Sequence, residues 1–444
     1  MCAERARRWH AAWLVLLLAL PGVASALAPI QHWRTPNGAR VYFVPARELP
    51  MVDARVVFDA GSARDAGHPG LARLTNALLD QGAGGLSADE LADRLGTLGA
   101  QLNTGSRRDM AWVSLRSLSA ADKLRPAAAL AAKVIGAPAF HRPDFKRERQ
   151  RLLVAAKQRE QQPDQVAEEA FHKALYGDHP YASPPGGTPA DLPVLTDEEV
   201  QGFYLRYYTA RNAVVAIVGD LDAKAAHRLA RTLTARLDKG DPAGALPPVS
   251  PLTGSTTRSV DFPSTQSTVL MGQPGVRRGD PDYFPLYVGN YVLGGGGLVS
   301  RLNEQIREKR GLSYSVYSYF LPMARKGPFV LGLQTRSDQT RKALDLMHQV
   351  LARYVKKGPT AEELEAAKKH ITGGFALRID TNRKVVEYLA MIGFYHLPLD
   401  YLQRFNARVE AVTREQIVKA FQRRVHPDRM VTVIVGPGSD APKQ

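Results

Sequence analysis

The chain has 444 residues, of which 44% are hydrophobic and 23% are charged, and its formal net charge is +16. These values fit a soluble globular protein and allow two to four domains of roughly 100–200 residues each. A charge this high suits nucleic-acid binding, but no aromatic-rich basic cluster or nucleic-acid motif is present. The basic residues are scattered, so general surface charge is the simpler interpretation; an acidic partner, an acidic peptide or an anionic envelope surface stay open.

The N-terminus has the three parts of a cleavable signal peptide. Arginines at 5, 7 and 8 precede an apolar run at 11–20, and Ala24-Ser25-Ala26 offers a small-residue cleavage site. An uncleaved anchor is the alternative, but the apolar run is shorter than the ~20 residues that span a bilayer. We therefore predict a signal peptide over 1–26 and export to the periplasm.

Export removes the only cysteine, Cys2, together with one glutamate and three arginines, which leaves a mature charge of +14. A chain without cysteine in an oxidising compartment has no disulfide, so we expect core packing alone to stabilise the fold. No cysteine stands at the cleavage site, which argues against a lipoprotein.

Short strands alternate with amphipathic helices through the first half of the mature chain. Helix starts are marked by Ser87 with Glu90 and by Thr196 with Glu199, the spacing of a capping box. A turn-rich loop is expected over 176–193. Strands are expected at 41–44, 54–58, 112–118 and 213–219, and helices at 70–81, 87–98, 120–135, 142–161, 196–207 and 223–237.

A stretch rich in proline, glycine and serine at 239–257 predicts a linker, and beyond it the pattern repeats. Residues 269–271 match 56–58, residues 430–436 match 213–219, and a glycine run recurs before a helix; these markers keep a nearly constant offset. We predict two homologous α+β domains, each a mostly antiparallel sheet with helices packed on one face. The boundaries are 27–240 for the N-terminal domain, 241–257 for the linker and 258–440 for the C-terminal domain.

The stretch 294–320 holds two polar side chains in a distinctive setting. Four glycines precede a predicted short helix with Val299, Leu302 and Ile306 on one face, and Gly311 ends it. A strand is expected over 312–320, so Arg307 lies near a helix end and Tyr314 near a strand start. Such a turn presents a cation and a phenol to a polar ligand, although an ion pair and ordinary strand packing would use the same residues.

A self-contained active site is missing from the sequence. No histidine has the spacing H-x-x-E-H or H-E-x-x-H that places two imidazoles on one metal ion, and there is no G-x-S-x-G elbow. The glycine run at 294–297 completes no phosphate-binding motif, so a tight turn packed against the sheet is the simpler interpretation. Carboxylates such as Glu168 and Glu169 are expected on solvated helix faces.

Nearly the whole mature chain resembles the pitrilysin-like zinc peptidases (peptidase family M16), which include the mitochondrial processing peptidase and the respiratory core subunits. The resemblance rests on the duplication and on the segment R-E-K-R-G-L-S-Y at 307–314. It implies that an arginine and a tyrosine seven residues apart contact the substrate beside zinc, here Arg307 and Tyr314. A guanidinium and a phenol can donate hydrogen bonds to a substrate carbonyl or oxyanion.

The same resemblance implies a lost zinc site. Active members read roughly G-L-A-H-x-x-E-H in the first helix, whereas this chain has Arg73, Asn76 and Ala77 at the three positions and Ala155 or Ala156 at the third ligand. A catalytic zinc needs three protein ligands, so no cofactor is expected in this chain. Zinc is expected in a partner subunit.

The resemblance further implies two chains closing around an extended peptide, which adds a strand to a sheet edge. The glycine-rich stretches near Gly82 and at Gly294, Gly295, Gly296 and Gly297 are the expected substrate-binding edge. The leading hypothesis is the zinc-lacking subunit of a periplasmic heterodimeric metallopeptidase. A peptide-binding or structural subunit with no peptidase role, and a stand-alone peptidase with a relocated metal site, stay open.

Overall fold

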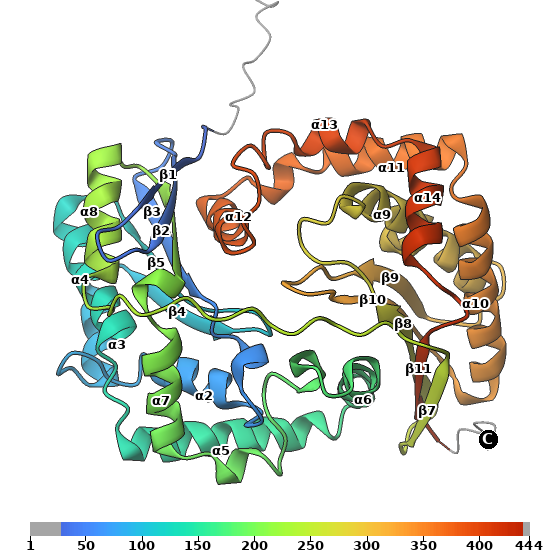
Figure 1. Ribbon diagram of the computed structural model, residues 1–444, viewed down its shortest axis with the longest axis horizontal. Coiled ribbons are helices and arrows are strands. Elements are labelled where there is room, and N and C mark those ends of the chain that lie inside the picture. Colours follow the sequence, from blue (N-terminus) through green and yellow to red (C-terminus); the bar gives the residue numbers. More distant parts are fainter. Residues whose placement is uncertain (1–27, 438–444) are drawn as a thin grey trace, which may run out of the picture.

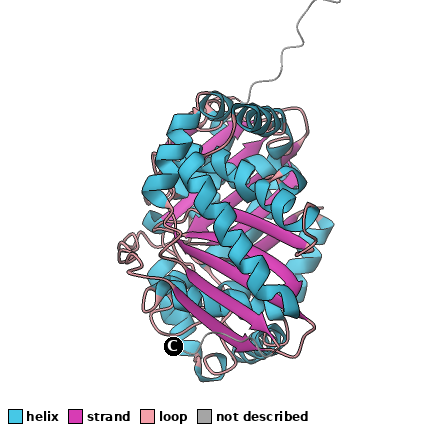
Figure 2. Cartoon of the chain, turned by 90° about the vertical axis from the view of Figure 1, so that its right-hand side faces the viewer, coloured by secondary structure: helices cyan, strands magenta, loops and turns pink. Residues whose placement is uncertain are grey.

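The computed structural model describes residues 28–437, so the predicted signal peptide and the last residues of the predicted C-terminal domain lie outside it. Two α+β halves stand side by side, each built on one sheet (Figure 1). Viewed from the C-terminal half, helices cross in front of the strands (Figure 2). The predicted fold class is confirmed. Within residues 28–437 no helix is both long and apolar enough to cross a membrane.

The N-terminal half holds a six-stranded sheet in the order β1-β2-β6-β3-β5-β4. Its strands are β1 (Gln31–Arg34), β2 (Arg40–Pro45), β3 (Met51–Phe58), β4 (Gln101–Ser106), β5 (Ala111–Leu118) and β6 (Ala213–Gly219). The helices of this stretch are α2 (Leu71–Leu78), α3 (Ala88–Thr97), α4 (Ala121–Gly136), α5 (Arg142–Arg159), α6 (Pro163–Tyr176), α7 (Asp197–Tyr207) and α8 (Ala223–Thr234).

The C-terminal half holds a five-stranded sheet in the order β7-β11-β8-β10-β9. Its strands are β7 (Thr256–Asp261), β8 (Gln266–Pro274), β9 (Ser315–Phe320), β10 (Pro328–Arg336) and β11 (Val431–Gly436). The helices are α9 (Tyr283–Asn290), α10 (Thr340–Lys357), α11 (Ala361–Gly373), α12 (Asn382–Phe394), α13 (Phe405–Glu410) and α14 (Arg414–Arg424).

The two sheets share one topology, as the sequence repeat predicts. In each sheet one pair of strands is parallel, β2 with β6 and β7 with β11, and the next three pairings are antiparallel. The repeated segments 56–58 and 269–271 lie on β3 and β8, which hold the same place in the two sheets. The halves are thus two copies of one unit, although the predicted boundaries at 240 and 257 remain predictions.

One helix of each half covers the sheet of the other half. Helix α12 packs on β6, β3 and β2, and helix α6 packs on β11 and β8. Strand β6 is buried on both faces: Val215 points into the N-terminal core, and Val214 joins the cluster that contains α12. Both helices lie between the two sheets in Figure 1. Each sheet therefore has helices on both faces, one of them supplied by the other half.

A buried carboxylate joins the halves where they meet. Asp109, in the turn before β5, accepts hydrogen bonds from the Tyr181 hydroxyl at 2.6 Å, the Ala324 amide at 2.7 Å and the Tyr395 hydroxyl at 2.9 Å. Burial raises the pKa of Asp109, while its three donors act in the opposite direction. Two of the donors come from the C-terminal half, so Asp109 fixes the relative position of the two halves.

The structure corrects several element predictions. Strands β1 and β4 and helix α6 were not predicted, because β1 and β4 are largely polar and the apolar face of α6 packs mainly on strands of the other half. The strand expected from 312 begins at Ser315, and β7 begins at Thr256, inside the predicted linker. Val299 is 75% exposed rather than part of the buried face, because the helix begins only after Ser300, whereas Leu302 and Ile306 are buried.

Candidate functional site

The sequence predicts a lost zinc site at the start of helix α2. The helix begins after Gly70, which has a left-handed backbone (φ 96°). The Asp65 carboxylate accepts hydrogen bonds from the backbone amides of Gly70 at 2.9 Å and Ala72 at 2.8 Å. Burial raises the pKa of Asp65 to about 8 against the effect of these two donors. The carboxylate thus serves the helix start, not a metal.

The three residues at the expected zinc and base positions of α2 face different surroundings. Arg73 is exposed and its Nη1 lies 3.5 Å from the Ser106 carbonyl oxygen. Asn76 is buried, and its amide donates to the Trp112 carbonyl and the Tyr208 hydroxyl, both at 3.3 Å. Ala77 is half-buried. The three positions thus hold the cation of Arg73, the buried and hydrogen-bonded amide of Asn76 and the methyl group of Ala77. This set of side chains does not fit zinc.

Helix α5 holds alanines at the position expected for the third zinc ligand. Ala155 is half-buried and Ala156 is buried, and neither side chain can bind a metal. Across residues 28–437, no group of three or more His, Cys, Asp or Glu side chains is placed to hold a metal ion. The expected ligand positions on α2 and α5 therefore provide no set of zinc ligands.

The second region contains Arg307 and Tyr314, and here the structure brings the two predicted residues together. Gly311 is left-handed (φ 60°), and its amide donates to the Arg307 carbonyl at 2.8 Å, while the Leu312 amide donates to the Ile306 carbonyl at 2.9 Å. This is the closure expected for a helix that ends in glycine. The Tyr314 amide then bonds the Gln334 carbonyl at 3.3 Å, which starts the pairing of β9 with β10.

This turn folds the phenol back toward the guanidinium. The Cζ atom of Arg307 lies 5.8 Å from the centroid of the Tyr314 ring, within the range of a cation–π contact. Tyr314 is 82% exposed, and the nearest carboxylate to Arg307, that of Glu308, lies 3.9 Å away. An ordinary strand tyrosine would be packed and a structural arginine firmly paired, so both side chains remain available to a ligand.

The glycine run before this turn is needed for packing. A Cβ on Gly294 would lie 2.4 Å from Ser318 Oγ, and one on Gly295 would lie 2.8 Å from Asn290 Nδ2. Asn290 and Ser318 bond each other twice, at 2.7 and 2.9 Å, and hold β9 on α9. Gly297 is left-handed (φ 62°) with open space around its Cβ position. The predicted role of Gly294, Gly295, Gly296 and Gly297 in substrate binding remains a prediction.

The edge strands differ from those expected. The stretch at Gly82 is a turn in which Ala83 pairs with Leu86 and Pro138, and Gly294 lies in a π-helical turn, Tyr291–Gly295. The edges of the sheets are β1, β4, β7 and β9. The expectation that the glycine-rich stretches form an edge strand was wrong, because glycine there permits tight turns rather than strand pairing.

Sequence reasoning missed a small cavity next to β9. It has a volume of about 230 Å³ and lies between α6 and the sheet, with Asp164 and Glu168 on one side and Tyr317 and Tyr319 on the other. The two rings are stacked with centroids 5.9 Å apart, and the pKa of Tyr317 is raised by burial and then by the two carboxylates. The sequence shows the i, i+4 spacing of Asp164 and Glu168. It does not show that Tyr317 and Tyr319 lie across the cavity from them.

The comparisons with known proteins agree with the duplicated fold. Residues 44–188 match the model described as insulinase (peptidase family M16), and residues 195–371 match the peptidase M16 inactive domain. An uncharacterized zinc protease of Mycobacterium tuberculosis is 28% identical over 428 residues, covering 93% of this chain and 94% of that protein. A non-peptidase homolog of Helicobacter pylori is 25% identical over 375 residues, covering 83% of this chain and 85% of that protein.

Among solved structures, a peptidase M16 inactive domain from Pseudomonas fluorescens is 40% identical, with a TM-score of 0.89, covering 92% of this chain and 98% of that one. A protease from Helicobacter pylori is 20% identical with a TM-score of 0.84 and shares the fold, covering 93% of this chain and 100% of that one. Fold and site thus define a two-domain protein of the insulinase-like class. The chain belongs to peptidase family M16.

Proposed function

We propose that this chain is the zinc-lacking subunit of a heterodimeric peptidase of this family, which supplies Arg307 and Tyr314 to a zinc-bearing partner. One observation carries the proposal: the Arg307 Cζ atom lies 5.8 Å from the centroid of the exposed Tyr314 ring. In contrast, α2 and α5 hold no metal ligand at the expected positions. Two such donors without a metal in the same chain make chemical sense if the metal belongs to another chain.

A zinc ion bound in the partner would supply Lewis-acid activation of the scissile carbonyl and of a water molecule. The residues of this chain hold the substrate: the guanidinium of Arg307 and the hydroxyl of Tyr314 donate hydrogen bonds to backbone carbonyls of an extended peptide. A phenol placed toward the oxygen that gains negative charge stabilises it more in the transition state than in the ground state. The exposure of Tyr314 leaves room for this contact.

The periplasm is the proposed location, supported by the signal-like first 26 residues and the lack of cysteine in the rest of the chain. N-terminal sequencing of the protein from an envelope fraction checks it. A first residue of Leu27 fits the proposal, and a chain that begins at Met1 in the cytoplasmic fraction contradicts it.

The decisive experiment is purification of the tagged mature chain from an envelope extract, followed by zinc analysis and assay on unstructured peptides. The proposal expects a co-purifying family member with an intact H-x-x-E-H, about one zinc per pair, and activity that neither chain has alone. A zinc atom bound tightly by the isolated chain would overturn it.

The second candidate is a peptide-binding or structural subunit with no peptidase role. The relative from Helicobacter pylori described as a non-peptidase homolog favours it. This reading expects partners without a zinc motif and an Arg307→Ala variant that assembles and functions normally. Activity gained on mixing with a zinc-bearing subunit excludes it.

A further inference from the structure

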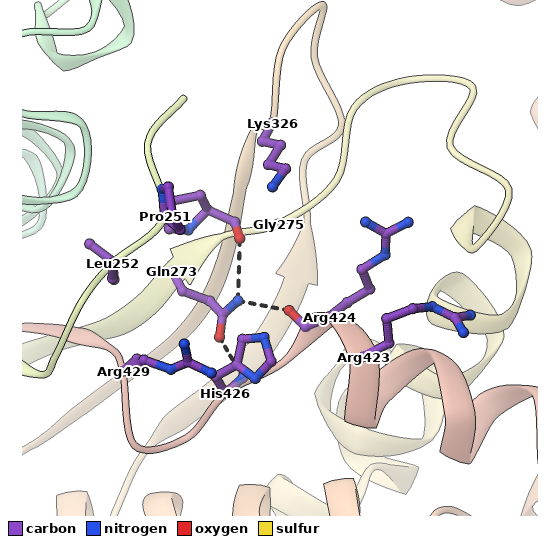
Figure 3. Close-up of a pocket in the computed structure, with 10 residues that line it drawn as sticks. Pro251, Leu252, Gln273, Gly275, Lys326, Arg423, Arg424, His426 and Arg429 are labelled. Atoms are coloured by element: carbon purple, nitrogen blue, oxygen red, sulfur yellow. Dashed lines mark hydrogen bonds between the residues drawn. The ribbon is translucent and has the colours of Figure 1, made fainter. Parts of the chain in front are cut away.

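A second polar region lies at the opposite end of the C-terminal sheet. Strand β8 ends at Pro274, which pairs with Pro328, whereas Tyr314 binds Gln334 near the other end of β10. A cavity of about 130 Å³ opens beside Pro274, bounded by the end of α14, the β9–β10 turn and the linker residues Pro251 and Leu252 (Figure 3). Its lining contains five basic side chains and no carboxylate: Lys326, Arg423, Arg424, His426 and Arg429.

Two of these cations are neutralised behind the cavity. Arg423 donates twice to Asp282, and Arg424 bonds Asp282 at 2.7 Å and Asp280 at 3.1 Å. In Figure 3 both guanidinium groups extend away from Gln273. Arg423 and Arg424 therefore line the cavity, and their charges are already neutralised by Asp280 and Asp282.

The other three basic groups are left for a ligand. Among residues 28–437 the Lys326 ammonium has no hydrogen bond or ion pair, and the His426 ring has no hydrogen bond. The Arg429 Nε is buried without a hydrogen bond; its nearest carboxylate, that of exposed Asp428, lies 3.6 Å away. The terminal N–H groups of Arg429 make no hydrogen bond within residues 28–437, so they can donate to an acceptor in the cavity.

The frame of the cavity is rigid. Gln273 is buried, donates to the Arg424 carbonyl at 2.7 Å and accepts from the His426 amide at 2.7 Å. These bonds fix the chain where α14 ends, and Figure 3 shows Lys326 and His426 on opposite sides of the glutamine with Arg429 beside His426. A site held this way is pre-organised, which lowers the entropy cost of binding.

We propose that this cavity binds a compact oxyanion of the phosphate type, held by Lys326, His426 and Arg429. The volume suits a single tetrahedral group, and the three donors match the acceptor oxygens of a phosphate. Free phosphate and the phosphate of an anionic lipid headgroup share this chemistry. The site is independent of the peptidase proposal, because its test uses binding alone.

The test is calorimetric titration of inorganic phosphate into the mature chain at constant ionic strength in a phosphate-free buffer. We expect a saturable one-to-one isotherm, with Kd raised at least tenfold in Lys326→Met and in Arg429→Gln. The matched control Lys224→Met, which removes the same charge from an exposed position on helix α8, should change Kd less than twofold. No saturable binding, an unchanged Kd in both variants, or equal weakening in the control overturns the proposal.

A second measurement keeps the proposal testable if a variant folds poorly. Burial, and then Arg429, lower the pKa of His426, so a bound anion should raise it. The ring signals of His426 in the unmodified chain should shift with phosphate, and unshifted signals at saturation contradict the site. Vesicles with phosphatidic acid identify the source: binding lost in Lys326→Met indicates a lipid headgroup, and no vesicle binding indicates a free anion.

Discussion

The start of α2 and the turn from Arg307 to Tyr314 use polar side chains in opposite ways. In α2 the polar side chain at the expected base position, Asn76, is buried and bonded to its own fold. At the turn, Tyr314 is among the most exposed aromatic side chains of the described chain. A residue kept for stability is buried and satisfied, whereas a residue kept for a ligand is exposed. The comparison predicts which substitutions should affect stability and which should affect activity.

The largest effect is expected at Tyr314. In the complex with a zinc-bearing partner, Tyr314→Phe should lower kcat/KM by roughly 10²–10³-fold, because it removes one donor to the transition-state oxyanion. The free energy of unfolding of the chain should stay within about 0.5 kcal/mol, since the hydroxyl is exposed. Peptide assays and urea denaturation check both parts.

Arg307→Ala should behave similarly, and Arg310→Ala is its matched control, because Arg310 bonds only Gln305 on the same helix. An unchanged kcat/KM in both Tyr314→Phe and Arg307→Ala would contradict the role of this turn in activity.

The joint between the two halves comes next. Asp109→Ala leaves the Tyr181 and Tyr395 hydroxyls and the Ala324 amide without their acceptor, and should lower the free energy of unfolding by about 3 kcal/mol. Urea denaturation measures the loss, with exposed Asp93→Ala on α3 as control. A loss below 0.5 kcal/mol would mean that the hydrogen bonds of Asp109 do not help to hold the halves together.

His172 on α6 sets a pH dependence. Burial, and then the Arg108 charge, lower the pKa of His172 to about 3, and its Nε2 is buried without a partner. Because this pKa lies below the ordinary value near 6.5, the unfolded chain takes up the proton first as pH falls, and stability decreases below pH 6.5. Between pH 7 and pH 5 the loss from this residue should be about 2 kcal/mol.

His172→Phe should remove that loss and keep the ring packing against Tyr176, whereas exposed His141→Phe should leave it. Urea denaturation at the two pH values tests this. Equal acid losses in the parent and in His172→Phe would contradict it.

The smallest effect is expected in α2. Asn76→Ala removes the amide that donates to the Trp112 carbonyl and the Tyr208 hydroxyl, which should cost about 1–2 kcal/mol of stability. The kcat/KM of the complex should change less than twofold. A tenfold loss of activity would show that α2 still contributes to the reaction and would end the contrast between the two regions.

Local signals in the sequence predicted much of the fold. Both capping boxes form as expected, with Ser87 accepting from the Glu90 amide and Thr196 from the Glu199 amide, each at 3.2 Å. The fully apolar run of β6 is buried on both faces. These features depend on residues within one turn or one strand, so sequence alone can show them.

The features that were missed depend on partners far along the chain. Helix α6 has an apolar face that packs mainly on β8 and β11, about a hundred residues or more further on. The cavity with Asp164 and Tyr317 exists only across that contact. Arg307 and Tyr314 were found because both lie in one short turn that Gly311 closes.

Because each sheet is covered by a helix of the other half, the N-terminal sheet is synthesised long before the helix that covers it. The last strand of the N-terminal sheet, β6, ends at Gly219, but the helix that covers its inner face, α12, begins only at Asn382. At roughly 5–20 residues per second, about 10–30 s separate the two on the ribosome. During that interval an apolar sheet face has no cover, so the N-terminal half cannot complete its native packing until the rest of the chain arrives.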